Sequence, residues 1–207
     1  MGQVLSLHEG LAAGQVFRGS RAPRRPADGL ASGFATLDEA LPWGGFPRGA
    51  LSEVLVPADG VGELELVLPA LATISRRDRI ALVAPPYLPY APALARAGVV
   101  LEKLAWIDAP AERSAWAAEQ CLRAGCFGAV LCWTRSGDER LLRRLQVAAS
   151  DGGAHAFVFR PARQAANPSP AALRLLLRGE PGQLALQVLK SRGAQPPAGT
   201  LRQPRRH

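Results

Sequence analysis

The sequence predicts an α/β fold in which a mainly parallel sheet, flanked by helices, ends in a C-terminal antiparallel hairpin. Short apolar segments alternate with helix-like segments between residues 51 and 159. Repeated alternation at this spacing implies right-handed crossovers between parallel strands, with helices on both faces of the sheet. After residue 170, two segments of alternating apolar residues are separated by the turn Gly-Glu-Pro-Gly at 179–182, which is typical of a hairpin.

The strands are expected at the apolar segments and the helices between them. The predicted parallel strands cover residues 51–56, 79–84, 103–107, 129–133 and 154–159. The predicted helices cover residues 63–74, 90–97, 112–124 and 138–150. The hairpin strands are expected at residues 172–178 and 183–190, where the antiparallel pair extends the end of the parallel sheet.

The chain divides into a core over residues 32–190 and two irregular ends. Residues 1–31 contain helix-compatible spacing at 4–17, followed by a basic, Pro-containing linker at 18–29. Residues 191–207 are rich in Pro, Gly and Arg and too poor in apolar residues to fold alone, so they predict a flexible basic tail. A length of 207 residues fits one domain with tails better than two domains.

The composition is that of a globular protein, with 48% hydrophobic and 20% charged residues. The net charge of +8 favours a negatively charged partner, either nucleic acid or an acidic protein, although basic tails can also serve solubility alone. The N-terminus has no signal-peptide pattern, and no apolar segment approaches the roughly 20 residues that span a bilayer. Three cysteines without a metal-binding spacing are expected as reduced thiols, so the predicted location is the cytoplasm, with no membrane contact.

A strand, a glycine turn and a helix at residues 51–74 form the local architecture that binds a nucleotide phosphate. A working phosphate loop also needs a Lys for the terminal phosphates and a Ser or Thr for magnesium. Here Gly60 and Gly62 are followed by Glu63 and Leu64. The carboxylate of Glu63 would lie where phosphate charge must be, and Leu64 cannot bind a metal.

The other catalytic positions of a nucleotide hydrolase are also changed. The strand at 129–133, whose end would carry the Walker B acid that holds magnesium, ends in Trp133. Pro85 and Pro86 stand where a catalytic acid would follow the strand at 79–84. We therefore expect no enzyme activity, no nucleotide cofactor, no bound metal and no catalytic residue.

Two segments before the first predicted core strand carry a family resemblance. Residues 33–41 read Gly-Phe-Ala-Thr-Leu-Asp-Glu-Ala-Leu and residues 44–49 read Gly-Gly-Phe-Pro-Arg-Gly. They resemble the Gly-x-x-x-Leu-Asp and Gly-Gly-Leu-Pro-x-Gly segments of RecA-type ATPases. Within that superfamily the chain is most similar to the ImuA family, in which Gly-x-Gly-Glu replaces Gly-Lys-Thr, as at residues 60–63. The resemblance extends over about residues 32–193.

The resemblance implies a RecA-like fold and a role as a non-catalytic accessory protein of translesion DNA synthesis in the SOS response to DNA damage. ImuA-like proteins act with ImuB, an inactive relative of the Y-family polymerases, and with the error-prone polymerase DnaE2. The resemblance also implies contacts with RecA and recruitment to the nucleoid.

Several residues are candidates for contact with a partner or with DNA. Trp43 lies in a glycine-flanked loop, whereas Trp106 and Trp133 lie in apolar strands and are expected in the core. The basic residues of the C-terminal region would either follow phosphates or bind an acidic partner, with a purely disordered end as the alternative. They are Lys190, Arg192, Arg202, Arg205 and Arg206.

Two other function classes compete with this hypothesis. Residues 88–104, with Arg-Ala-Gly at 96–98, resemble the middle region of SulA-like cell-division inhibitors, which bind FtsZ. SulA-like chains generally lack the RecA-like segment at 33–49, and this segment favours the first hypothesis. An active DNA-dependent ATPase is disfavoured by Glu63, Leu64 and Trp133.

Overall fold

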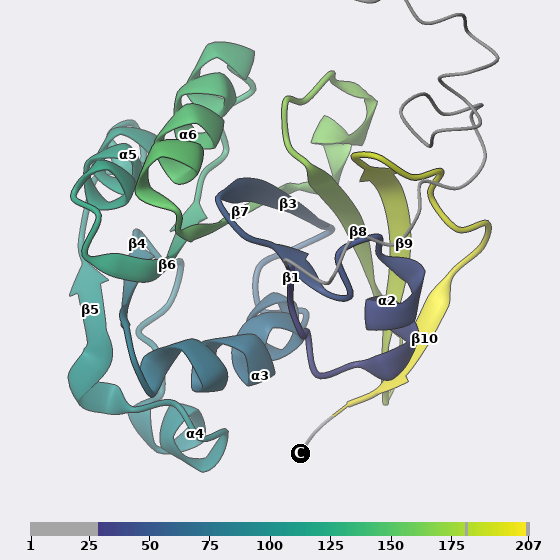
Figure 1. Cartoon of the computed structure of the whole chain (residues 1–207), viewed down its shortest axis with the longest axis horizontal. Helices are drawn as coiled ribbons and strands as arrows, with labels where there is room; N and C mark the ends of the chain where they lie inside the picture. The colour runs from purple at the N-terminus through teal and green to yellow at the C-terminus, as the bar shows by residue number, and fades with distance from the viewer. Residues whose placement is uncertain (1–28, 181, 206–207) are drawn as a thin grey trace, which may run out of the picture.

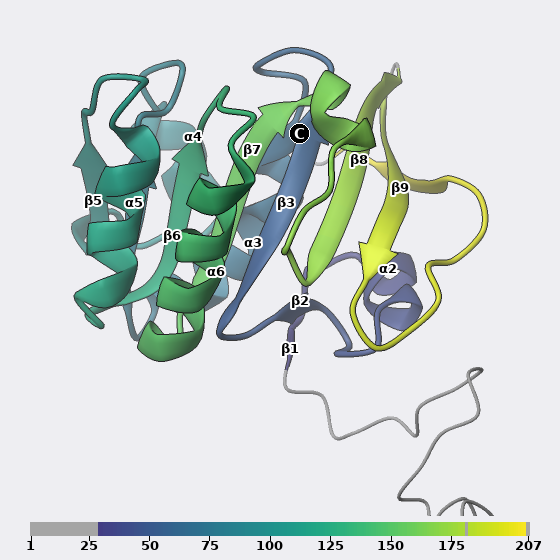
Figure 2. The ribbon, with the colours of Figure 1, turned by 90° about the horizontal axis from the view of Figure 1, so that it is seen from above.

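An eight-stranded sheet runs through the centre of the molecule (Figure 1; Figure 2). The computed structural model describes residues 29–180 and 182–205, so the predicted helix at 4–17 and most of the basic linker lie outside the described residues. The strand order is β10-β9-β8-β3-β7-β6-β4-β5. In chain order the strands of this sheet are β3 (Ala50–Val56), β4 (Arg79–Val83), β5 (Leu104–Ile107), β6 (Phe127–Trp133), β7 (His155–Pro161), β8 (Leu173–Glu180), β9 (Gln183–Ser191) and β10 (Leu201–Pro204).

The strands from β5 to β8 in this order run parallel, whereas β9 and β10 are antiparallel to their neighbours. Strand β3 lies between β7 and β8, and all of its residues are buried. Such burial fits a strand that is covered on both faces. The predicted fold class is confirmed: each predicted parallel strand forms, and the predicted hairpin is β8–β9.

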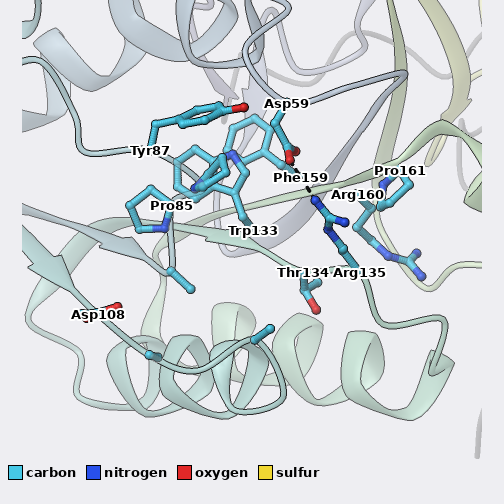
Figure 3. Close-up of a pocket in the computed structure, with 14 residues that line it drawn as sticks. Asp59, Pro85, Tyr87, Asp108, Trp133, Thr134, Arg135, Phe159, Arg160 and Pro161 are labelled. Carbon is cyan, nitrogen blue, oxygen red and sulfur yellow. Dashed lines mark hydrogen bonds and ion pairs between the residues drawn. The ribbon is translucent and has the colours of Figure 1, made fainter.

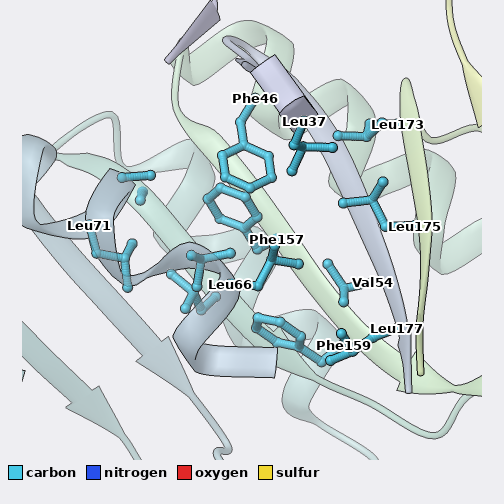
Figure 4. Packing of buried hydrophobic residues seen from close by; sticks show 14 of the residues in the cluster. Leu37, Phe46, Val54, Leu66, Leu71, Phe157, Phe159, Leu173, Leu175 and Leu177 are labelled. Carbon is cyan, nitrogen blue, oxygen red and sulfur yellow. The ribbon is translucent and has the colours of Figure 1, made fainter. Parts of the chain in front are cut away.

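Helices form a layer on each face of the sheet (Figure 2). Helices α2 (Ala35–Ala40), α3 (Glu63–Ser75) and α4 (Ala91–Arg96) contribute to one hydrophobic cluster, and α5 (Ser114–Arg123) and α6 (Glu139–Gly152) to the other. The first cluster contains large side chains, including Phe46 and Phe157, whose rings meet edge to face at 4.9 Å (Figure 4). The second cluster is rich in alanine from α5 and α6, which allows these helices to pack closely against each other.

Local sequence signals explain the helix boundaries. The side chain of Asp138 caps α6 by accepting a hydrogen bond from the backbone N–H of Arg140 at 2.8 Å. Gly153 ends the same helix with a φ of 65°, a conformation that glycine adopts at little cost. Helix α5 starts at Ser114, two residues later than predicted, because residues 111–113 form a turn after Pro110.

The segment that precedes β3 is held by a short two-stranded sheet, β1 (Gly29–Leu30) with β2 (Phe46–Pro47). Between these strands, Asp38 accepts a hydrogen bond from the backbone N–H of Ser32 at 2.8 Å. The Gly-x-x-x-Leu-Asp motif therefore serves a local structural role, in which Leu37 is fully buried and Asp38 fixes the start of the segment.

The prediction that Trp106 lies in the core is wrong. Its side chain is 55% exposed. Strand β5 is the edge of the sheet and pairs only with β4, so its side chains have one neighbouring strand instead of two. Trp133 is half-buried and stacks on Phe159, with 4.6 Å between the ring centroids.

The prediction of a flexible tail from residue 191 is wrong for residues 201–204, which form β10 and pair with β9. Backbone pairing to the β9 edge supplies the stability that the segment's few apolar residues cannot. Leu201 packs against the first hydrophobic cluster, Gln203 is buried, and Arg202 forms an ion pair with Glu180 at 3.1 Å. Residues 201–204 are therefore part of the sheet, and residues 192–200 connect them to β9.

A buried ion-pair network joins the three central strands. Glu53 of β3 is fully buried and binds Arg160 of β7 through Oε1 and Arg174 of β8 through Oε2, the latter at 2.6 Å. Arg160 also donates to the carbonyl of Ser136 at 2.6 Å, and Arg174 donates to the carbonyl of Gln164 at 3.0 Å. The network thereby fixes two loops against the sheet.

Candidate functional site

The loop between β3 and α3 has the shape of a phosphate loop but is closed by its own side chain. Glu63, the first residue of α3, is 5% exposed, and its Oε1 accepts a hydrogen bond from the backbone N–H of Gly60 at 3.0 Å. In a phosphate-binding loop, such N–H groups face the anion. Here a carboxylate takes one of them and brings negative charge to the position that a phosphate would need. Leu64 packs against the first hydrophobic cluster.

A second contact closes the same loop from outside. Arg205, which follows β10, donates from Nη2 to the carbonyl of Val61 at 2.5 Å and lies 3.8 Å from a carboxylate oxygen of Glu65. Gly62 has a φ of 109°, and a Cβ there would lie 2.7 Å from Leu184 of β9, so only glycine fits. The C-terminal segment and the loop therefore form one packed unit.

A cleft of about 380 Å³ lies beside this loop, at the carboxyl edge of the parallel strands (Figure 3). This edge is where ligands bind in open α/β sheets. The lining comes from the carboxyl ends of β6 and β7 and from the segments that follow β3, β4, β5 and β6. The lining residues are Asp59, Ala84, Pro85, Pro86, Tyr87, Asp108, Ala109, Ala111, Trp133, Thr134, Arg135, Phe159, Arg160 and Pro161.

The cleft combines aromatic surface with charge. Arg135 forms an ion pair with Asp59 at 3.2 Å across one side of it. Trp133, where a nucleotide hydrolase would carry its magnesium-binding acid, instead stacks on Phe159. Its Nε1 is buried without a hydrogen-bond partner among the described residues. Ala84, at the end of β4, has a φ of 49°, a strained conformation that tends to occur at functional sites.

The polar side-chain groups of the cleft lining are few: carboxylate, guanidinium, hydroxyl and the indole N–H of Trp133. Among the described residues, no group of three or more His, Cys, Asp or Glu side chains could hold a metal ion. The side chains of the lining that can exchange a proton are those of Asp59, Asp108 and Tyr87. Its carboxylates, Asp59 and Asp108, lie on opposite sides of the aromatic residues in Figure 3.

The described basic residues of the C-terminal region are bound to the body of the protein. Lys190 and Arg192 donate to the carbonyls of Ser169 and Pro170, at 2.7 and 2.9 Å. Partial burial, with the neighbouring arginines, lowers the pKa of Lys190. Arg202 and Arg205 make the contacts given above, and Arg206 lies outside the described residues. These cations are distributed over the loops and strands that they hold, and the structure does not gather them into one flexible arm.

The structure also shows the surroundings of Trp43 and His155, two residues considered in the sequence analysis. Trp43 is half-buried against the first hydrophobic cluster, which leaves only part of its ring for a partner. His155 is buried as expected, and its Nδ1 donates to the carbonyl of Pro47 at 3.1 Å. Burial lowers the pKa of His155 to about 4, so the imidazole is neutral at pH 7.

Sequence reasoning missed Asp59, Tyr87, Asp108 and Arg135. They lie far apart in the chain, and only the parallel sheet brings their loops together. The sequence did contain one usable signal. Residues that follow the carboxyl ends of parallel strands meet at one edge of the sheet, so the predicted strands could have located this set.

Comparisons with known proteins support a distant relation. No model of a known protein family matches this chain. Over 101 residues, or 47% of the chain, the sequence is 35% identical to protein RecA of Borrelia hermsii, with the same match in strain HS1 / DAH. The matched region covers 28% of those proteins, so the chain spans little more than a quarter of their length. The chain is a distant relative of RecA.

The structure is also similar to the crystal structure of SulA from Pseudomonas aeruginosa. This similarity covers 53% of the chain and 97% of SulA, at 24% sequence identity and a TM-score of 0.45. Within residues 29–180 and 182–205, no helix has both the length and the apolar character to span a bilayer.

Proposed function

We propose that this chain is a non-catalytic accessory protein of DNA-damage-induced translesion synthesis that acts through protein contacts. The observation that carries the proposal is the hydrogen bond between Glu63 and the backbone of Gly60. It supports the loss of nucleotide binding, because a phosphate group would have to displace a buried carboxylate of the same charge sign. The distant relation to RecA supports descent from a nucleotide-binding fold whose site has been closed.

The expected partners follow from the sequence resemblance to the ImuA family. They are ImuB, the error-prone polymerase DnaE2 and RecA. The closed loop, the cleft and the exposed apolar side chains beside it support a role in assembly. A protein of this kind would link the polymerase components to each other or to RecA on damaged DNA.

Co-expression of the full chain with ImuB, followed by purification through a tag on ImuB, tests the proposal. We expect a stable complex in size-exclusion chromatography, and no binding of ATP by the chain at millimolar nucleotide. A complex with FtsZ and none with ImuB would favour the SulA-like alternative. Binding of ATP with magnesium, followed by hydrolysis, would refute a non-catalytic role.

A further inference from the structure

The lining of the cleft at the carboxyl edge contains two carboxylates and two arginines, and one of the carboxylates has no counter-charge among the described residues. Among the described residues, Asp108 has no hydrogen-bond or ion-pair partner, and its side chain is exposed. Asp59 is paired only with Arg135, whose side chain is 78% exposed. Such exposed pairs contribute at most about 1 kcal/mol and are easily exchanged for another cation. Asp108 is therefore available to a basic ligand, although the whole chain carries a charge of +8, and Asp59 becomes available when Arg135 is displaced.

Aromatic rings lie between the two carboxylates. In the view of Figure 3, Tyr87 and Trp133 lie between Asp59 on one side and Asp108 on the other, and all four residues line the cleft. Tyr87 is 67% exposed, and Phe159 supports the indole of Trp133 from behind by stacking. A guanidinium group stacks on aromatic faces and binds carboxylates with its N–H donors. The aromatic rings of Tyr87 and Trp133, together with the unpaired carboxylate of Asp108, are thus complementary to an arginine side chain.

The segment after β4 makes this surface rigid and extends it beyond the cleft. Pro85, Pro86 and Pro89 restrict its backbone, which lowers the conformational entropy lost when a partner binds. Leu88 and Tyr90 are 70% and 67% exposed. Large apolar side chains that are exposed together on a loop are typical of protein interfaces, where tyrosine is enriched among the residues that dominate affinity.

We propose that this cleft receives an arginine side chain from an extended segment of a partner protein. Asp108 binds the guanidinium group, Tyr87 and Trp133 offer aromatic faces to it, and Leu88 and Tyr90 pack against the flanking residues of the segment. The inference rests on the proposed function and deepens it, because it assigns the partner contact to the edge where a nucleotide hydrolase would bind its substrate. A nucleic acid is the competing ligand: its phosphates could pair with the exposed Arg135 but would meet the unpaired carboxylate of Asp108 in the same cleft.

A peptide titration tests the inference with the full chain. The probe is the capped tripeptide Gly-Arg-Gly, and the control is the same peptide with citrulline, which has the shape of arginine without its charge. The readout is the indole N–H signal of Trp133 in ¹H–¹⁵N spectra, assigned with a Trp133→Phe variant. We expect the arginine peptide to shift this signal in a saturable manner and the citrulline peptide to leave it unchanged at the same concentration.

Two exposed substitutions should move the affinity in opposite directions. Asp108→Asn should weaken arginine-peptide binding about two- to fivefold, the range expected for one exposed charge pair. Arg135→Gln should strengthen binding by a similar factor, because it removes a competing cation from the lining of the cleft. Glu102→Gln removes an exposed carboxylate at the opposite end of β5 and should leave the affinity unchanged.

Equal shifts with arginine and citrulline peptides, or equal affinity in Asp108→Asn and the unmodified chain, would overturn the inference. The proposed function is tested separately in the same spectra by titration with ATP and magnesium. A saturable shift of the Gly60 amide by ATP would refute the closed phosphate loop, whatever the arginine peptide does.

Discussion

The carboxylate of Glu63 is bound to the backbone N–H of Gly60, three residues earlier in the chain, at 3.0 Å. A phosphate loop works because its N–H groups are free for an anion. In this chain the first residue of α3 supplies the anion itself. This hydrogen bond lies within one turn of backbone, and Arg205 from the C-terminal segment holds the same loop at the carbonyl of Val61.

Restoring the missing phosphate-loop residues should not restore catalysis. The double variant Glu63→Lys, Leu64→Thr removes the internal carboxylate and adds the expected Lys and Thr. ATP turnover should still be undetectable by phosphate release, because Trp133 and Pro85 occupy the positions of the missing acids. Magnesium-dependent phosphate release by this variant above that of the unmodified chain would contradict the assignment of those positions.

Removal of the Arg205 side chain should loosen the loop. Arg205→Ala removes the hydrogen bond to the carbonyl of Val61 and the pairing with Glu65. We expect faster amide hydrogen exchange at residues 58–63, with the protection of β3 and β7 unchanged. The matched control is Arg202→Ala, which removes a more exposed ion pair between β10 and Glu180 of β8. If both variants alter the loop equally, the specific role of Arg205 is wrong.

Loss of the buried carboxylate in β3 should be strongly destabilising. Glu53→Gln leaves Arg160 and Arg174 buried without a counter-charge, and breaking a buried pair in this way costs ~3–5 kcal/mol of unfolding free energy. Denaturant unfolding measures the change. Glu139→Gln, which removes an exposed ion pair with Arg143 on α6, should cost under ~0.5 kcal/mol. A similar small loss in both variants would show that the buried network contributes little.

Stability should depend on pH through His155. Its pKa is lowered from 6.5 to about 4 by burial, so the unfolded chain binds a proton at higher pH than the folded protein does. The neutral imidazole therefore stabilises the fold fully above pH 6.5, and about 3 kcal/mol of this is lost as the pH falls to 4. Unfolding curves of the unmodified chain and His155→Gln between pH 7 and 4 measure the difference. Parallel pH profiles for the two proteins would contradict the shift.

Apolar periodicity was enough to predict the parallel sheet and its crossover helices. The strand around Ala129–Cys132, for example, is apolar on both faces and is buried on both faces. The same reasoning failed for Trp106, because an apolar strand has the same sequence pattern at the centre of a sheet as at its edge. It also failed for residues 201–204, whose order comes from pairing with β9 and not from their own composition.

The candidate site was predictable only in part. Glu63 and Leu64 could be interpreted from the sequence because the phosphate-loop pattern is local. Asp108 and Tyr87 could not, because their importance depends on which loops the strand order brings together. The predicted role of the basic C-terminal residues changed for a related reason. Arg205 and Lys190 contact carbonyl groups far away in the chain, and charge counting alone cannot reveal such contacts.

Glu53 shares its two carboxylate oxygens between Arg160 and Arg174, which come from the strands on either side. Side chains alternate between the faces of a sheet, so a one-residue slip of β8 would move Arg174 to the opposite face and leave an uncompensated charge inside. The network therefore selects against misregistered pairing during folding as well as stabilising the final sheet. Over evolutionary time, these three positions should change together, as a single unit of substitution, and an apolar replacement of one should be tolerated only when the other two are replaced as well.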